Sequence, residues 1–266
     1  MMTDQPLRVV VTGAARGIGF GIVRAFAHRG ADVALSDIDG PAAEQAAAQI
    51  NAEIGAERVR PYTVDIADSK SVSQMMDDFA AGVGPLTTVI ANAGVTVYKP
   101  FLETDVSTFD RILAVNLRGT YFTAQAGARH MVANGTAGRI LLLSSVVGQR
   151  AFRNFSLYSL TKAGIAMLAQ SLALELGAYG ISVNAISPGA ILTERTQAED
   201  PRYAENWASV IPKGRVGTVD DVANTALWLA EEAASHITGQ NIVVDGGWLT
   251  YGHVPLDHPD MPQVDE

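Results

Sequence analysis

The stretch LRVVVTGAARGIG, from Leu7 to Gly19, decides the fold. It opens with short, apolar, β-branched residues that predict a strand, and a helical pattern follows that stops at Gly30. A glycine-rich turn between a strand and a helix lets phosphate oxygens reach backbone N–H groups, so this turn predicts a phosphate-binding loop. The residues assigned to cofactor contact here are Gly13, Arg16, Gly17, Ile18 and Gly19. A plain glycine-rich turn is the structural alternative, because the spacing is Gly-x-x-x-Gly-x-Gly rather than the commoner G-x-G-x-x-G.

The next predicted strand, 31–36, ends in Asp37, 18 residues beyond Gly19. An acidic residue at that place can bind the hydroxyl groups of an adenosine ribose. Its carboxylate would also repel a 2′-phosphate, so Asp37 favours NAD over NADP. Arg16 favours the opposite choice, since a guanidinium in the glycine loop could pair with that phosphate. We give Asp37 precedence because it lies where the phosphate would have to bind.

Two further predicted strands end in residues that suit a nucleotide. The strand 58–64 is followed by Asp65 and Ile66, and the Asp65 carboxylate could accept a hydrogen bond from an adenine amino group or cap the helix that starts at Ser69. The strand 87–91 is followed by Asn92, Ala93 and Gly94. These small residues allow a flat ligand to approach closely, and Asn92 can brace neighbouring backbone; a simple turn is the alternative.

The stretch from Ser145 to Lys162 carries the predicted chemistry. It follows the apolar run 140–143 and leads into an apolar-periodic segment, which predicts a strand, a loop and a helix. Tyr158 and Lys162 are four residues apart, so their side chains share one helix face. A tyrosine hydroxyl titrates near 10 and is a poor base at neutral pH, but a neighbouring ammonium favours the phenolate. Tyr158 could then take a proton from a substrate hydroxyl whose oxygen Ser145 holds by a hydrogen bond.

The remaining pattern alternates strands and helices. A long helix is expected over 109–131, in which Asn116 is disfavoured intrinsically and is therefore either exposed or functional. A strand over 181–186 ends in Ser187, Pro188 and Gly189, and 190–217 loses all periodicity, which we interpret as an irregular substrate lid. Thr218 should cap a helix that runs to Leu229, and a last strand is expected over 240–245. Such alternation predicts one α/β domain over 1–266, with a parallel sheet covered on both faces.

Composition narrows the classes of partner. The net charge of −9 argues against nucleic acid and anionic membranes, and the absence of cysteine excludes disulfides, thiolate metal sites and a cysteine nucleophile. We therefore expect no metal site. No apolar run approaches the roughly 20 residues that span a bilayer, and the amino terminus lacks the apolar core of a signal peptide. A soluble, cytoplasmic protein is expected.

These motifs resemble those of the short-chain dehydrogenases/reductases over nearly the whole chain, from about Leu7 to Trp248. The matching pieces are Thr12-Gly13-x3-Gly17-x-Gly19, Asn92-Ala93-Gly94, Asn116, Ser145, Tyr158-x3-Lys162 and Pro188-Gly189. The resemblance implies a Rossmann-like, doubly wound fold whose seven parallel strands have the order 3-2-1-4-5-6-7. It also implies a homotetramer.

The resemblance implies a role for each matched residue. Tyr158 would be the general acid/base, Ser145 would orient the substrate oxygen, and Lys162 would also hold the nicotinamide ribose. Asn116 would support a water chain for the proton. Other cofactor contacts would come from Pro188, Gly189, Ile191 and Thr193.

The function expected on these grounds is NAD-dependent oxidation of a secondary alcohol or reduction of a ketone, with a sugar or polyol as the substrate. Arg150, Arg153 and Arg195 could hold an anionic group or be ordinary solvated arginines. Trp207 and Tyr251 could stack on a sugar ring or fill the core. The alternatives are an NADPH-dependent 3-oxoacyl reductase and a non-catalytic NAD-binding scaffold. The tail, 249–266, could reach a neighbouring subunit or fray.

Overall fold

A computed structural model describes residues 7–250. In this range seven strands form one sheet, and every neighbouring pair is parallel. The spatial order β3-β2-β1-β4-β5-β6-β7 confirms the prediction from the sequence. The strands are β1 (Arg8–Thr12), β2 (Asp32–Asp37), β3 (Val59–Thr63), β4 (Thr88–Ala91), β5 (Arg139–Leu143), β6 (Ser182–Pro188) and β7 (Asn241–Val244).

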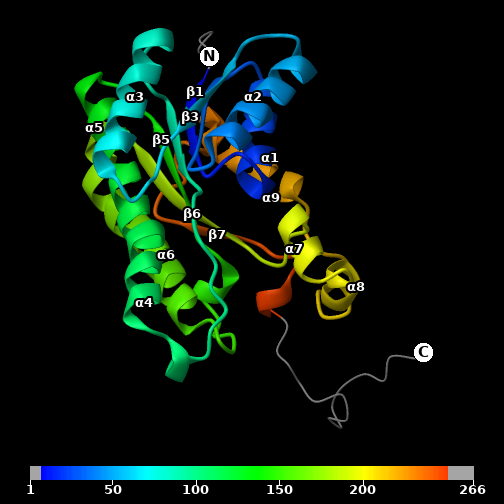
Figure 1. The fold of residues 1–266 in the computed structure, drawn as a ribbon. Coiled ribbons are helices and arrows are strands. Elements are labelled where there is room, and N and C mark those ends of the chain that lie inside the picture. The colour runs from blue at the N-terminus through cyan, green and yellow to red at the C-terminus, as the bar shows by residue number, and fades with distance from the viewer. Residues whose placement is uncertain (1–6, 251–266) are drawn as a thin grey trace.

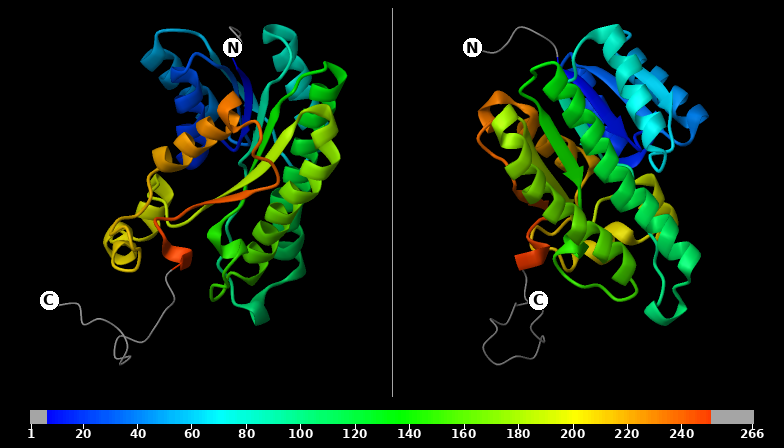
Figure 2. Two further views of the ribbon diagram at one scale, coloured as in Figure 1. Left: turned by 180° about the vertical axis from the view of Figure 1, so that it is seen from behind. Right: turned by 90° about the vertical axis from the view of Figure 1, so that its left-hand side faces the viewer.

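Helices cover both faces of this sheet (Figures 1 and 2). One face carries α1 (Gly17–His28), α2 (Gly40–Ile54) and α9 (Val219–Ala230). The other carries α3 (Ser69–Val83), α5 (Thr120–Ala133) and α6 (Ser156–Leu176), with α4 (Val106–Ile112) at its end. None of the helices between residues 7 and 250 combines the length and the apolar composition that crossing a membrane requires.

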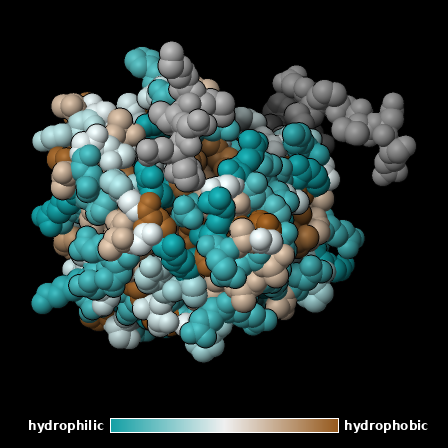
Figure 3. Space-filling view, turned by 90° about the horizontal axis from the view of Figure 1, so that it is seen from above, coloured by the Kyte–Doolittle hydropathy of each residue, from teal (hydrophilic) through white to brown (hydrophobic). Residues whose placement is uncertain are grey.

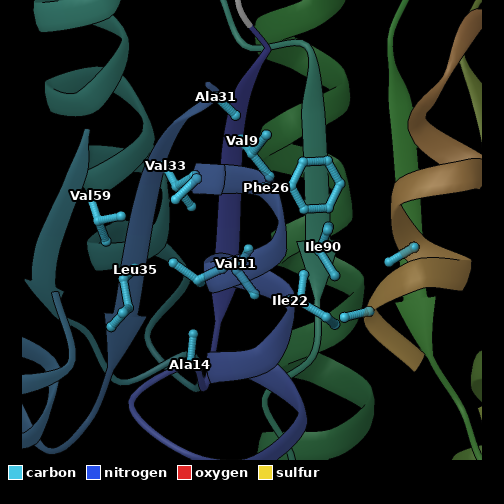
Figure 4. Packing of buried hydrophobic residues seen from close by; sticks show 14 of the residues in the cluster. Val9, Val11, Ala14, Ile22, Phe26, Ala31, Val33, Leu35, Val59 and Ile90 are labelled. Carbon is cyan, nitrogen blue, oxygen red and sulfur yellow. The ribbon is translucent and has the colours of Figure 1, made fainter. Parts of the chain in front are cut away.

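The core on the α1 face shows why the opening stretch folds as it does. Phe26 and Ile22 on α1 are fully buried and point at the alternate valines of β1 (Figure 4). Val10, which lies between these valines on β1, faces the opposite side of the sheet and packs in a second core cluster with residues of α3, α5 and α6. Burying such side chains contributes about 1.5–3 kcal/mol each, so the apolar runs hold β1 at the centre of the sheet. Side chains on the face seen in Figure 3 are mostly hydrophilic, with hydrophobic residues scattered among them.

Two segments differ from their predictions. The long helix begins at Val106 rather than 109, and between α4 and α5 it contains a π-helical segment, η2 (Leu113–Gly119). Residues 190–217 are not irregular throughout, because they include α7 (Glu194–Glu199) and α8 (Tyr203–Ala208). Both helices have six residues, which is too short for an amphipathic period to be visible in the sequence.

Of the two residues considered as helix caps, Thr218 caps its helix and Asp65, for which capping was one of two alternatives, does not. Thr218 caps α9 through a capping box with Asp221, as expected. The cap of α3 is Asp68, whose side chain accepts from the backbone N–H of Lys70, and not Asp65. The tail beyond residue 250, including Tyr251, lies outside the described residues.

Candidate active site

The loop after β1 requires glycine at two of its positions. Gly13 and Gly17 have φ of 61° and 58°, in the left-handed region that side chains disfavour. A Cβ at Gly13 would lie 2.6 Å from the Cα of Ala93, which follows β4. The glycine loop and the end of β4 therefore touch backbone to backbone, because the carboxyl ends of parallel strands meet at one edge of the sheet.

Asn92 holds this contact together. Its side-chain nitrogen donates to the carbonyl oxygens of Thr12 (2.9 Å) and Gly13 (2.7 Å). The Thr12 hydroxyl in turn accepts from the backbone N–H groups of Asn92 and Ala93, each at 3.2 Å. Asn92 is thus a brace between two loops, which agrees with the first of its two sequence interpretations and not with a simple turn.

A cavity of about 730 Å³ opens along these loops. It is large enough for a dinucleotide-sized ligand. Its lining includes most of the predicted cofactor residues: Gly13, Arg16, Gly17, Ile18, Gly19, Asp37, Asp65, Ile66, Asn92, Ala93, Gly94 and Thr193. The remaining ones, Pro188, Gly189, Ile191, Tyr158 and Lys162, are not part of this lining. The lining also includes Arg195, which the sequence analysis considered for an anionic group, and residues that it missed: Ile38, Asp39, Val64, Ala67, Val95, Arg111, Ala114, Val115 and Glu194.

Asp37 is fixed at the end of β2 by two backbone donors. Its carboxylate accepts from the N–H of Ala15 and from the N–H of Asp39, both at 3.1 Å. Arg16, which the sequence offered as a phosphate-binding cation, instead forms an ion pair with Asp39 at 2.6 Å. No sequence pattern indicates that pair, because its members are 23 residues apart. This end of the cavity therefore holds two carboxylates and one guanidinium.

Asn116 is completely buried inside the π-helical segment η2. Its side-chain oxygen accepts from the N–H of Val95 at 2.8 Å, and its nitrogen donates to the Val95 carbonyl at 2.9 Å and to the Thr161 hydroxyl at 3.2 Å. Asn116 is therefore engaged rather than exposed. It ties the loop after β4 to the helix that carries Tyr158, whose carbonyl accepts from the same Thr161 hydroxyl at 2.7 Å.

The predicted catalytic residues lie at the end of β5 and on the first turns of α6. Ser145 follows β5, and its hydroxyl accepts from the N–H of Val147 at 3.4 Å. Lys162 is only 4% exposed, and its ammonium nitrogen lies 5.5 Å from the ring centroid of Tyr158 while donating to the Leu143 carbonyl at 2.7 Å. The structure thus brings the buried Lys162 side chain against the ring of Tyr158, one helical turn away on α6.

Ser144 is a positioning residue that the sequence did not reveal. Its hydroxyl donates to the carbonyl oxygen of Lys162 at 2.7 Å, and both groups are buried. This bond joins the end of β5 to α6. No sequence motif indicates this role of Ser144, because a serine next to Ser145 has no distinctive spacing.

Residues 190–217 contribute Thr193, Glu194 and Arg195 to the lining of the large cavity. Thr193 caps α7 through a capping box with Thr196. Burial raises the pKa of Tyr203 on α8 to about 12, with a smaller lowering effect from Arg195, so this phenol stays neutral at physiological pH. Ile191 is buried and pairs with Gly217, so its side chain packs in the core.

The three arginines considered for an anionic group do not gather at one point. Arg195 pairs with Glu199 at 3.0 Å and lines the large cavity. Arg150 lies over the ring of Trp248 and lines a different cavity, while Arg153 is exposed and lines neither. The structure therefore does not support a shared anion site built from all three.

The fold and this site together define a nucleotide-binding α/β oxidoreductase. A family model described as enoyl-(acyl carrier protein) reductase matches residues 13–249. The chain belongs to the short-chain dehydrogenase/reductase family and acts on CH–OH groups or the corresponding ketones.

Several curated relatives are similar over almost their full lengths. The chain is 36% identical to a galactitol 2-dehydrogenase (L-tagatose-forming) of Cereibacter sphaeroides, covering 91% of this chain and 94% of that protein. It is 35% identical to the 3-oxoacyl-[acyl-carrier-protein] reductase FabG of Chlamydia trachomatis (90% and 95% covered). It is also 35% identical to human L-xylulose reductase (91% and 96% covered).

Solved structures agree with this assignment. A short-chain type dehydrogenase/reductase from Mycobacterium marinum superposes with a TM-score of 0.86 at 33% identity, covering 92% of this chain and 96% of that one. A structure described as ElxO with NADP bound gives a TM-score of 0.87 at 28% identity, covering 93% and 100%.

Proposed function

We propose that this protein is an NAD-dependent dehydrogenase of secondary alcohols, with Tyr158 as the general acid/base. The observation that carries the cofactor choice is the Asp37 carboxylate, which is held by the N–H groups of Ala15 and Asp39 at the ribose end of the cavity. A 2′-phosphate there would meet a fixed negative charge, and like-charge juxtaposition costs several kcal/mol. The one nearby cation, among the residues 13–39 that line this cavity, is Arg16, and Asp39 already pairs with it.

The chain's own groups fit a nicotinamide dinucleotide. The glycine loop lies at the amino terminus of α1, where N–H groups can receive a pyrophosphate. Asp37 would bind the adenosine ribose, while Asp65 and Ile66 would border the adenine. Thr193, with Pro188, Gly189 and Ile191 behind it, would lie toward the carboxamide. When bound, the cofactor supplies the hydride acceptor or donor.

The residues at the proposed reaction centre would transfer one proton from the substrate hydroxyl and stabilise the groups that hold it. In the oxidative direction the Tyr158 phenolate would take the proton of the substrate hydroxyl. The Ser145 hydroxyl would donate a hydrogen bond to the substrate oxygen and so orient it. The Lys162 ammonium, buried beside the Tyr158 ring, would stabilise the phenolate and bind the nicotinamide ribose. Asn116 would support the water chain that carries the proton away.

The substrate class that we propose is a sugar or polyol. Support comes from the relatives whose names describe such activities, the galactitol 2-dehydrogenase and the L-xylulose reductase. A second candidate is NADPH-dependent reduction of a 3-oxoacyl thioester, which the similarity to FabG favours and Asp37 opposes. Oxidation of NADPH by an acetoacetyl thioester, with no reduction of NAD by polyols, would decide for this second candidate.

Cofactor binding can be tested without knowing the substrate. Isothermal titration calorimetry of the full chain should give a dissociation constant for NAD at least about 10-fold lower than for NADP. In Asp37→Asn the difference should shrink to a few-fold or less, since the fixed charge is gone. Asp65→Asn, which alters a carboxylate elsewhere in the same cavity, is the matched control and should keep the preference. Equal or tighter binding of NADP by the unaltered protein would overturn the assignment.

We also propose a homotetramer in the cytoplasm. Support for assembly comes from apolar side chains that are exposed on α4, on α6 and on the short turn Phe101–Glu103 before α4. Among them are Leu102 (94% exposed), Val106 (75%) and Leu160 (53%). Patches of this kind mark protein–protein contacts. The absence of cysteine is compatible with a reducing compartment. Light scattering of the purified protein measures the mass of the assembly directly.

A further inference from the structure

A connected series of aromatic rings leads away from Tyr158. The ring of Phe155 meets Tyr158 edge-on at 5.6 Å between centroids, and Phe152 meets Phe155 in the same way at 5.6 Å. Trp207 then stacks on Phe152 at 6.1 Å with an interplanar angle of 28°, and Trp248 contacts Trp207 at 5.9 Å. We call Phe152, Phe155, Trp207 and Trp248 the aromatic wall. None of its four residues lines the large cavity.

Three separate segments build this wall. Phe152 and Phe155 come from the loop between β5 and α6, Trp207 from α8, and Trp248 from the last turn, η6 (Trp248–Thr250). Figures 1 and 2 show α8 and the last turn close together beyond the carboxyl ends of the strands. Rings from three segments that converge next to the proposed catalytic tyrosine indicate a surface formed for a ligand.

A second cavity, of about 370 Å³, lies against the wall. Its lining consists of Arg150, Ala151, Phe152, Asn206, Trp207, Val210 and Trp248. Five of these seven side chains are apolar. Both polar side chains already have contacts, since the Arg150 guanidinium lies 5.5 Å from the centroid of the Trp248 ring and the Asn206 nitrogen donates to Asp200 at 3.0 Å.

This lining suits a ring better than an open polyol chain. An open-chain polyol carries a hydroxyl on nearly every carbon, and each hydroxyl buried against rings without a partner loses its hydrogen bonds to water. A ring presents a flat apolar or C–H face that can pack on an aromatic side chain. Phe152 is also 38% exposed, so this cavity has apolar surface that such a ring could cover.

We infer that the substrate's reacting carbon lies in a ring or is bonded directly to one, and that the ring packs on the aromatic wall. This inference rests on the proposed function, which supplies the reaction. Sugar rings, alicyclic rings and aryl rings share the required flat face, so the test distinguishes these three sources. The inference predicts that open-chain alditols are the poorer substrates within the polyol class.

The test compares pairs of alcohols that differ mainly in whether a ring is present. With the full chain and NAD, kcat/KM is measured for cyclohexane-1,2-diol against hexane-2,3-diol, for glucose against sorbitol, and for 1-phenylethanol against 2-octanol. At least one cyclic member should exceed its open-chain partner by about 10-fold or more. Open-chain members that match or exceed the cyclic ones in every pair would overturn the inference while leaving the proposed function intact.

Two tryptophan variants test whether the wall is responsible. Trp207→Leu should reduce the preference for the ring about 10-fold, chiefly through KM, and Trp207→Phe should restore much of it. Trp228→Leu is the matched control, because Trp228 lies on α9 and is not part of the wall or its cavity. An unchanged ring preference in Trp207→Leu, in protein that still binds NAD normally, would contradict the inference.

The absence of NAD reduction with every alcohol tested would also be informative. If no alcohol reduces NAD, the proposed function is wrong for these substrates, and the same pairs are titrated by calorimetry into protein saturated with NAD. Tighter binding of a cyclic member, lost in Trp207→Leu, supports the ring inference. Equal or weaker binding of every cyclic member overturns it.

Discussion

Replacing Asn116 with alanine tests the most connected polar side chain of the site. The change removes three hydrogen bonds: two with the backbone of Val95 and one with the Thr161 hydroxyl. At about 1 kcal/mol of net stabilisation per bond, Asn116→Ala should lower the free energy of unfolding by about 3 kcal/mol. For a domain near this size, each kcal/mol shifts Tm by about 2–4 °C, so a fall of about 6–12 °C is expected.

Differential scanning calorimetry measures this shift. Asn134→Ala is the control, because Asn134 is exposed at the end of α5 and bonds only to His130 among the contacts of the described chain. That control should change Tm by no more than about 1–2 °C. NAD affinity should fall in Asn116→Ala only, since Val95 borders the cofactor cavity. A Tm within 2 °C of the unaltered protein would refute the account of Asn116 as the link between the loop after β4 and helix α6.

Three further predictions concern charge and backbone. Lys162→Ala removes the ammonium that lies beside the Tyr158 ring, so kcat/KM for alcohol oxidation with NAD should fall about 100-fold or more, whereas Lys162→Arg should keep more of the activity; an unchanged kcat/KM counts against the mechanism. The hydrogen bond from Arg215 lowers the pKa of Asp221 in the folded protein. The ionised Asp221 carboxylate therefore stabilises the fold at pH values above about 4, the usual carboxyl pKa, and this stabilisation is lost as the pH falls further. Asp221→Asn should thus cost about 1 kcal/mol at pH 7 in chemical denaturation, with a smaller difference at low pH. Gly13→Ala should destabilise more than Gly30→Ala, since both positions have positive φ but only at Gly13 does the new Cβ meet backbone; equal Tm values would exclude that contact as the cause.

The parts of the fold that could be predicted depend on the pattern of apolar and polar residues within short stretches of the sequence. Continuous apolar runs such as 140–143 identify strands buried on both faces, and their alternation with helices determines a parallel sheet. The positions proposed for catalysis could be named because Tyr158 and Lys162 share a helix face and Ser145 ends a strand. Each of these inferences uses residues close together in the chain.

The parts that could not be predicted depend on contacts between distant segments. The π-helical segment around Asn116 needs the loop at Val95 as a partner, and the ion pair of Arg16 with Asp39 spans two crossover units. The aromatic wall joins residues from three loops or short helices, so no window of sequence displays it. Asp65 was considered as the cap of the helix at Ser69, but the structure places Asp68 there instead.

The direction of the sheet has a practical consequence for handling the protein. All seven strands between residues 7 and 250 run the same way (Figure 1), so β1 starts at the edge of the sheet opposite the strands' carboxyl ends. Residues that follow these carboxyl ends line the large cavity. A purification tag joined before Leu7 would leave from that remote edge. A tag joined after Thr250 would leave beside Trp248, next to the second cavity. Tagging the amino-terminal end is therefore the better choice for enzymology, and immobilisation through that end would keep the reactive side turned toward the solution.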